Sequence, residues 1–425
     1  MKIAIIGAGF TGLAAADVLL HQSHEVTVFE KADVAGGLAA GFKDPGWDWS
    51  LEKHYHHLFT SDAFIRDLAA HIGHPLEFHR PATSTWVPQG IYRLDSPLHL
   101  LLFPGLPFLD RLRTGLVLGF FKLNPFWRPL EKITAEKFIL AAMGRASWRV
   151  LWQPLLEHKF GRYSSRVSAS WFWARIYKRS PVLGYPEGGF QSLAASLTGH
   201  LQTAGGRFIF NTGIEKITPV TDGLGLLTDS QKAFTFDRVI CTLPSPLFTR
   251  ICPALPAAYQ NHLNSLSGVG AVNLVLALKK PFLPRHIYWL NVNVPGTPFL
   301  AVVEHTNFIS SSHYSGRHLV YLGNYLPFAH PYFQKNPDQL LSEFLPALRR
   351  INPDFDPSWV VGSWVWKAPF AQPIVPINYS SALPSIATPV PHLFLANIQQ
   401  VYPWDRGTNY AVELGQRAAK LCLTD

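Results

Sequence analysis

The chain has 425 residues, of which 48% are hydrophobic and 15% are charged. This composition excludes a disordered protein and allows a sizeable core in two domains of ordinary size. The formal charge of +9 favours an anionic partner, but the 37 basic residues are scattered and no nucleic-acid module is present in the sequence, so we expect no nucleic-acid partner.

The chain begins with a pattern typical of a strand, a glycine-rich turn and a helix. Residues 3–6 are apolar, Gly7, Gly9 and Gly12 form a GxGxxG motif, and alanine and leucine follow at helical spacing. Gly7 permits a tight turn, Gly9 lets the backbone approach a pyrophosphate, and Gly12 lets the helix pack against the strand. The N-terminus of the helix would face the anion, so the motif predicts dinucleotide binding.

A second strand, EVTVFE, ends at Glu30, 18 residues after Gly12. A carboxylate at this place accepts both ribose hydroxyls and disfavours a 2′-phosphate, so NADP is not expected. A glycine pair follows in KADVAGGL, where backbone without side chains can run close to a bulky cofactor. The candidate cofactor contacts in this stretch are Lys31, Gly36, Gly37 and Leu38.

This order of GxGxxG, acid and glycine pair resembles the N-terminal signature of the flavoprotein family that includes flavin amine oxidases, protoporphyrinogen oxidases and phytoene desaturases. Residues 185–193 are similar to the GG-x-x-x-L segment of that family, and HLFLANIQQVYPWDRGTNYAVELGQ is similar to its closing strand, loop and helix. The resemblance implies FAD as the cofactor. It also implies that the last helix directs its N-terminus toward the flavin.

The closing strand differs from the usual family pattern. Many members carry Gly-Asp where this chain has Ala396-Asn397. Asparagine keeps one acceptor and adds donors, so it can still hold the cofactor. Together with Thr408 and Asn409 at the start of the last helix, Asn397 completes the expected FAD contacts.

We expect an α/β fold in which a discontinuous, Rossmann-like FAD-binding domain carries an inserted α+β substrate domain. The FAD-binding domain takes residues 1–60, 185–250 and 388–425. Residues 61–184 show helical spacing and form a mostly helical cap. Residues 251–387 contain alternating apolar runs between turns and form an antiparallel sheet.

Residues 96–127 are strongly apolar, but prolines and charges interrupt them, so they do not predict a spanning helix. Two interpretations remain open. The segment lies on a membrane surface with Arg111, Arg113, Lys122 and Arg128 near the headgroups, or it forms buried helices that line an apolar pocket. Three widely spaced cysteines suit a cytoplasmic location, and the first interpretation adds contact with the inner face of the membrane.

The stretch SLEKHYHHLF, residues 50–59, contains three histidines and one lysine. A metal site is not favoured here, because Lys53 would oppose a cation. A packed, partly solvated loop and a flavin-proximal role both remain open, since the resemblance places this stretch where the family's chain passes the flavin. Lys53 and His56 are the candidate general bases.

The same stretch supports a second resemblance. HYHHLFTSD is similar to a segment of UDP-galactopyranose mutase. That resemblance implies an enzyme in which reduced flavin acts as a nucleophile on a sugar nucleotide rather than as a hydride acceptor.

The closing loop YPWDRGTNY supplies further candidates. Tyr402, Trp404 and Tyr410 have rigid, flat side chains that suit the wall of a substrate cavity. Arg406 is a candidate catalytic residue that would bind a carboxylate or diphosphate through two parallel hydrogen bonds, or would instead pair with a neighbouring acid.

The resemblance implies an FAD-dependent oxidoreductase that takes hydride from a substrate C–H. The apolar insert favours a hydrophobic or lipid-linked substrate, whereas the histidine stretch and the basic charge favour a nucleotide sugar. A non-catalytic FAD-binding protein is the third possibility. The sequence does not indicate the oligomeric state.

Overall fold

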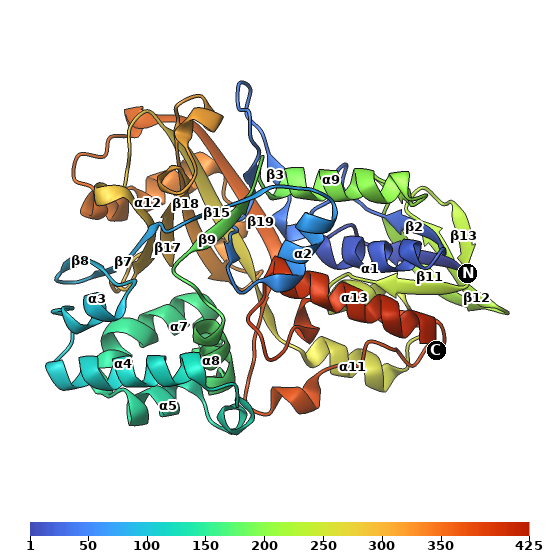
Figure 1. Ribbon diagram of the computed structural model, residues 1–425, viewed down its shortest axis with the longest axis horizontal. Coiled ribbons are helices and arrows are strands. Elements are labelled where there is room, and N and C mark those ends of the chain that lie inside the picture. Colours follow the sequence, from blue (N-terminus) through green and yellow to red (C-terminus); the bar gives the residue numbers. More distant parts are fainter. Residues whose placement is uncertain (425) are drawn as a thin grey trace.

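The computed structural model describes residues 1–424, so Asp425, the last residue of the range predicted for the FAD-binding domain, lies outside the described residues. Five short parallel strands carry the glycine motif. Their order across the sheet is β10 (Arg207–Ile209), β2 (Glu25–Phe29), β1 (Lys2–Ile6), β14 (Arg238–Cys241) and β20 (Leu393–Leu395). These strands come from three distant parts of the chain (Figure 1), and the predicted α/β fold with a discontinuous dinucleotide-binding unit is confirmed.

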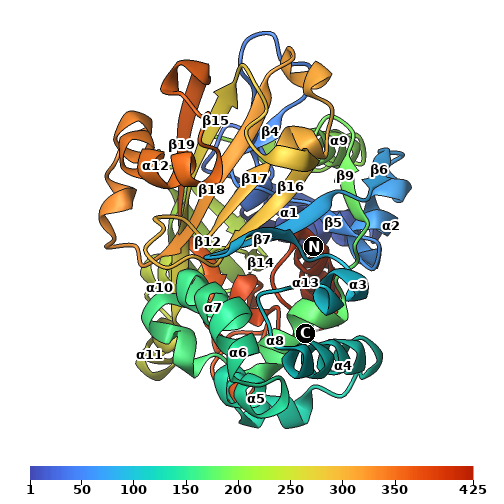
Figure 2. The same cartoon turned by 90° about the vertical axis from the view of Figure 1, so that its left-hand side faces the viewer.

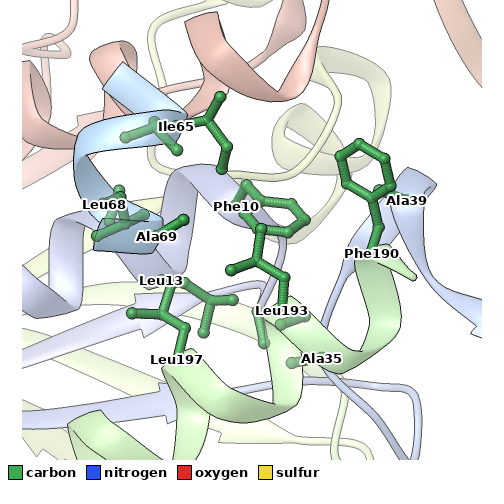
Figure 3. Close-up of a cluster of buried hydrophobic side chains, with 14 of the residues drawn as sticks. Phe10, Leu13, Ala35, Ala39, Ile65, Leu68, Ala69, Phe190, Leu193 and Leu197 are labelled. Atoms are coloured by element: carbon green, nitrogen blue, oxygen red, sulfur yellow. The ribbon is translucent and has the colours of Figure 1, made fainter. Parts of the chain in front are cut away.

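Helices pack closely around this sheet because small residues let them approach. The helices are α1 (Phe10–His21), α2 (Ala63–His71), α9 (Phe190–Thr203) and α13 (Thr408–Thr424). A Cβ on Gly12 would lie 2.0 Å from the carbonyl oxygen of Gly7, and a Cβ on Gly415 would lie 2.1 Å from that of Thr11. Glycine is therefore required where α1 meets β1 and where α13 crosses α1. Side chains of α1, α2 and α9 interlock there in one apolar cluster (Figure 3).

A larger, seven-stranded sheet forms the second layer of the molecule (Figure 1). Its order is β19 (Val360–Pro373), β15 (Gly268–Leu278), β18 (His318–Leu326), β17 (Ala301–Glu304), β16 (Ile287–Val292), β7 (Ala82–Val87) and β8 (Gly90–Arg93). The pairing is antiparallel except between β7 and β16, which run parallel. The sheet is therefore mixed, and its last two strands come from the stretch 61–184, which the sequence predicted as mostly helical. Helix α12 (Pro337–Ile351) packs against β15 and β19.

Residues 97–177 of the same stretch form a helical layer below the large sheet (Figure 2). Its helices are α3 (Pro97–Leu101), α4 (Phe108–Leu123), α5 (Ala135–Ala142), α6 (Arg145–Ser147), α7 (Gln153–Phe160) and α8 (Ala169–Tyr177). Trp171, Phe172 and Trp173 of α8 are fully or almost fully buried, which makes α8 the central helix of this layer. Among the described residues, no helix has the length and hydropathy needed to cross a membrane.

Three small sheets and two helices complete the structure. The sheets consist of β11 (Ile214–Val220), β12 (Gly223–Thr228) and β13 (Ala233–Phe236); of β5 (Leu58–Phe59), β9 (Leu183–Pro186) and β6 (Leu76–His79); and of β3 (Gly41–Phe42) and β4 (Leu51–Glu52). The helices are α10 (Ser245–Ile251) and α11 (Ala257–Ser265). The histidine stretch includes β4 and β5, and its three histidines lie between these two short strands, which anchor them at both ends.

Candidate active site

The glycine motif forms a bare backbone surface at the end of β1. Gly7 has a φ of +104°, and a Cβ on Gly37 would lie 3.1 Å from the Cα of Gly9. The glycine pair thus packs directly on the glycine-rich turn, and side chains at either place would fill the space. In the part of the chain that the structure describes, no side chain caps the first turn of α1, so its amides are available to a pyrophosphate.

Glu30 is positioned beside this turn. Its Oε2 accepts a hydrogen bond of 2.7 Å from the amide of Ala8, and its Oε1 accepts one of 2.9 Å from the amide of Ala32. Each oxygen keeps a further lone pair, so the carboxylate can still accept ribose hydroxyls. Lys31 is exposed beside it, and Leu38 is half-buried. The residues present therefore fit FAD.

Asn397 connects the closing strand to the loop after β14. Its Nδ2 donates to the carbonyl of Leu243 and to the hydroxyl of Ser245, each at 3.1 Å, and its Oδ1 accepts from the amide of Gln399. These bonds tie Asn397, which stands where many family members carry the acid, to the loop after β14. The predicted contact of Asn397 with the cofactor stays a prediction.

A cavity of about 140 Å³ lies between the histidine stretch, helix α8 and the beginning of α13. His56 and His57 line it on one side, and Arg406, Thr408, Asn409 and Tyr410 line it on another. The sequence predicted five of these six residues, all but His57, as cofactor, substrate or catalytic residues. Residues separated by about 350 positions in the chain thus meet at one site.

All three histidines of the stretch are held neutral. Burial, with smaller contributions from neighbouring charges, lowers the pKa of His54 and His57 to about 3 and that of His56 to about 4. The Nδ1 atom of His56 lies 2.6 Å from the carbonyl oxygen of His54. A carbonyl only accepts, so Nδ1 carries the proton and Nε2 keeps a lone pair that can accept one.

The histidine rings do not converge on a common point. The Nδ1 atom of His54 pairs with Nδ2 of Asn273, and the Nδ1 atom of His57 pairs with the hydroxyl of Tyr288. Among the described residues, another group places ligand atoms within 4.8 Å of one another: Asp17, His71 and His200. That group lies on α1, α2 and α9 and contains none of the histidines of the stretch.

Three of the six predicted catalytic and substrate residues, Lys53, Tyr402 and Trp404, do not line this cavity. The Nζ atom of Lys53 lies 4.9 Å from the ring centre of Trp366 on β19. Tyr402 and Trp404 line a smaller neighbouring cavity, and Trp404 stacks on Tyr410 with ring centres 5.5 Å apart. Trp404 therefore packs against the ring of Tyr410, which lines the main cavity.

Arg406 is held by neutral partners. Its Nε donates to Oε1 of Gln372 at 2.9 Å, and one of its terminal nitrogens donates to the hydroxyl of Tyr325. Its amide, rather than its guanidinium, bonds to Asp405. The alternative of a structural pair with a neighbouring acid does not describe this side chain, so its positive charge remains available to the cavity.

Reasoning from the sequence missed most of the charged residues at this site: Lys159, Arg175, Lys178, Arg179, Asp62 and Asp405. The signal was present, because Lys159 follows Leu155 by four positions and Arg175 follows Trp171 by four. Lys159 and Arg175 therefore each lie on the apolar face of a helix, where a solvated cation is not expected.

Comparison with known proteins agrees with this geometry. The family model described as flavin containing amine oxidoreductase matches residues 10–423. The chain belongs to this family, and it is an FAD-dependent oxidoreductase. Over 51 residues, or 12% of the chain, it is also 51% identical to 4,4'-diapophytoene desaturase (4,4'-diaponeurosporene-forming) of Staphylococcus aureus strain COL. That match spans 10% of the length of the desaturase.

Solved structures share the whole fold. A protein assigned as a protoporphyrinogen oxidase from Exiguobacterium sp. 255-15 has a TM-score of 0.77 and 17% identity, over 100% of this chain and 99% of that one. Reduced UDP-galactopyranose mutase has a TM-score of 0.79 and 16% identity, over 99% of this chain and 95% of that one. At these identities, the likeness establishes the fold alone.

Proposed function

We propose that this oxidoreductase removes hydride from a C–H bond of a substrate held in the cavity between the histidine stretch, α8 and α13. The observation that carries the proposal is that His56, Arg406 and the first residues of α13 line one cavity. The family's chemistry requires a substrate position next to the residues expected to contact FAD, and Thr408 and Asn409 are two of those residues.

FAD, when bound, supplies the hydride acceptor for this chemistry. The chain itself supplies orientation and a proton acceptor. Nε2 of His56 is the group that can take a proton from a substrate N–H or O–H, because its other nitrogen is engaged by His54. Tyr55 and Trp289 pack with ring centres 5.0 Å apart and form an apolar wall that excludes water from the same space.

We also propose that the enzyme works at a membrane surface, on a lipid-linked or otherwise amphiphilic substrate. Ten of the sixteen large apolar side chains exposed in the described chain lie within residues 98–126, so the exposure is concentrated on α3, α4 and the segment that follows them. This apolar face consists of Leu98, Leu101, Leu102, Phe108, Leu109, Leu112, Leu116, Phe120, Leu123 and Phe126. The alternative interpretation of residues 96–127, buried helices that line an apolar pocket, does not account for the exposure of these ten side chains.

The apolar face and the cavity are structurally connected. The Nζ atom of Lys122 on α4 donates to the carbonyl oxygen of Arg179, and Arg179 lines the cavity. In this proposal, a substrate with its apolar chain in the membrane presents its polar end to the cavity. Basic side chains beside the face, such as Arg128, would favour anionic headgroups.

A second candidate function is a mutase-like reaction on a nucleotide sugar, in which the flavin stays reduced. The observation that favours it is the number of positive side chains around the cavity, since five of the lining residues are lysine or arginine. A diphosphate is the group that such a wall would attract.

Electron flow separates the two candidates. Purified protein loaded with FAD is mixed without oxygen with a polyene, a porphyrinogen, a lipid-linked compound or a nucleotide sugar, and the flavin absorbance is followed. Loss of the oxidised flavin bands with one compound supports hydride removal. Turnover of a nucleotide sugar only after prior reduction by dithionite, with the flavin still reduced at the end, would replace it with the mutase function.

A further inference from the structure

We propose that the cavity binds a phosphate or diphosphate group of the substrate, and that Lys159, Arg175 and Arg179 are the residues that hold it. This inference rests on the proposed function, because it names the substrate class of the same cavity. It does not depend on which of the two reactions the flavin performs.

The cavity wall carries a large excess of positive charge. Its five cationic residues are Lys159, Arg175, Lys178, Arg179 and Arg406, and its two carboxylic residues are Asp62 and Asp405. The histidines are neutral, as shown above, so three positive charges have no carboxylate at the cavity. A phosphate ester carries close to two negative charges at neutral pH and a diphosphate carries at least as many, which matches this excess better than one carboxylate does.

Two of these cations are deeply buried and share one acid. Lys159 is 5% exposed and Arg175 is 8% exposed. The Nζ atom of Lys159 lies 3.5 Å from Oδ2 of Asp405, and Nη1 of Arg175 lies 3.8 Å from the same oxygen. One carboxylate neutralises only one of the two charges, and an unneutralised buried charge is strongly unfavourable. A bound anion would supply the missing charge.

The electrostatic field at the cavity supports the same conclusion. Burial lowers the pKa of Lys159 well below its usual range; Asp405 opposes this shift, while Arg175, Arg406 and Arg179 add to it. Burial together with Arg175 lowers the pKa of Arg179 to about 9, which leaves its guanidinium charged at neutral pH. The neighbouring cations and the burial thus both disfavour the charged form of Lys159, and a bound anion would favour it.

The side chains have the shape that a phosphoryl group requires. Arginine presents a planar fork that binds two phosphate oxygens at once, and lysine adds a compact point charge. Helix α13 begins at Thr408 beside them and adds the partial positive charge of its N-terminus. Tyr55, His56 and Trp289 are among the uncharged residues of the wall, and they leave a region for the part of the substrate that reacts.

A structural explanation for the cations is incomplete. Lys159 and Arg175 lie in the last turns of α7 and α8, where the helix dipole favours positive charge. That effect is small and operates equally at exposed helix ends. It does not explain why both side chains point inward to the same acid, Asp405.

The test measures binding of inorganic pyrophosphate to the FAD-loaded protein by isothermal titration calorimetry, with succinate as the carboxylate probe. Bound FAD keeps the probe out of the cofactor's own pyrophosphate site. We expect pyrophosphate binding that weakens as salt rises, and at least about a tenfold loss of affinity in Lys159→Met and in Arg179→Gln. Lys280→Met is the matched control, because its Nζ lies 5.1 Å from the ring centre of Trp359 at the surface.

Each outcome decides the proposal. Absence of pyrophosphate binding, tighter binding of succinate than of pyrophosphate, or equal affinity in all variants would overturn it. Arg179→Gln keeps the test valid if Lys159→Met does not fold, since Arg179 is only half-buried. A neutral compound that reduces the flavin equally well in wild type and Lys159→Met would overturn the anion site but leave hydride removal intact. Failure to bind FAD would instead overturn the proposed function.

Discussion

The Nζ atom of Lys159 lies 3.5 Å from Oδ2 of Asp405, and this pair joins helix α7 to the loop that leads into α13. Oδ1 of the same carboxylate accepts hydrogen bonds from Nε1 of Trp171 at 3.1 Å and from the amide of Arg406 at 3.2 Å. Burial by itself would raise the pKa of Asp405, but Lys159, Arg175 and Arg406 outweigh it and hold the pKa well below its usual range. The acid is therefore ionised and connects three separate elements.

Replacing this acid should destabilise the fold. In Asp405→Asn, two buried cations lose the carboxylate they share, so we expect the free energy of unfolding to fall by about 3–5 kcal/mol. Urea denaturation monitored by tryptophan fluorescence measures it. Asp354→Asn, at an exposed position, should change the value by less than about 0.5 kcal/mol. Equal stability of the two variants would contradict the assigned role of Asp405.

Glu30 should control cofactor retention. Glu30→Gln removes the negative charge that would bind the ribose hydroxyls, and a hydrogen bond to a charged group contributes about 1.5–3 kcal/mol, so FAD should bind at least about tenfold more weakly. The fraction of FAD remaining after dialysis checks this. The matched control is Glu25→Gln, at the exposed start of β2, and identical retention in both variants would refute the ribose role.

His56 should make stability depend on pH. Because burial lowers its pKa from 6.5 to about 4, its contribution to stability is complete above pH 6.5 and is lost as the pH falls from 6.5 to about 4. His56→Phe keeps a ring beside Phe190 but has no group to protonate. On acidification from pH 7 to pH 5, the variant should therefore gain about 1–2 kcal/mol relative to wild type. A constant difference between the two proteins would show that His56 is not held neutral.

The apolar face of α3 and α4 should mediate membrane contact. Leu116 is 75% exposed and Phe120 is 58% exposed, so replacing both with serine should leave the melting temperature nearly unchanged while reducing sedimentation with anionic liposomes. Phe328→Ser is the control, since its side chain is 61% exposed but lies between β18 and α12. Wild-type protein that stays in the supernatant at low salt would refute the proposal.

The amino-acid sequence by itself was sufficient for the cofactor and the class of enzyme. The GxGxxG turn, Glu30 and the pair Gly36-Gly37 lie within 31 consecutive residues, and each acts through backbone geometry or one local carboxylate. Such features are readable without knowledge of distant contacts. The α/β fold was predicted correctly for this reason, and the resemblance of these motifs to the flavoprotein signature correctly implied FAD.

Only the tertiary structure decided which residues share the cavity and which side of the helical insert faces solvent. Lys159, Arg175, Arg179 and Arg406 are separated by up to 247 positions, and each looks ordinary in its own segment. Their combined charge appears only when α7, α8 and the closing loop meet around Asp405. From the sequence, residues 96–127 could form either a surface segment or part of the core, because hydrophobicity alone does not specify what covers a helix. Within the folded residues 1–424, no other element covers the apolar face, so its side chains are exposed.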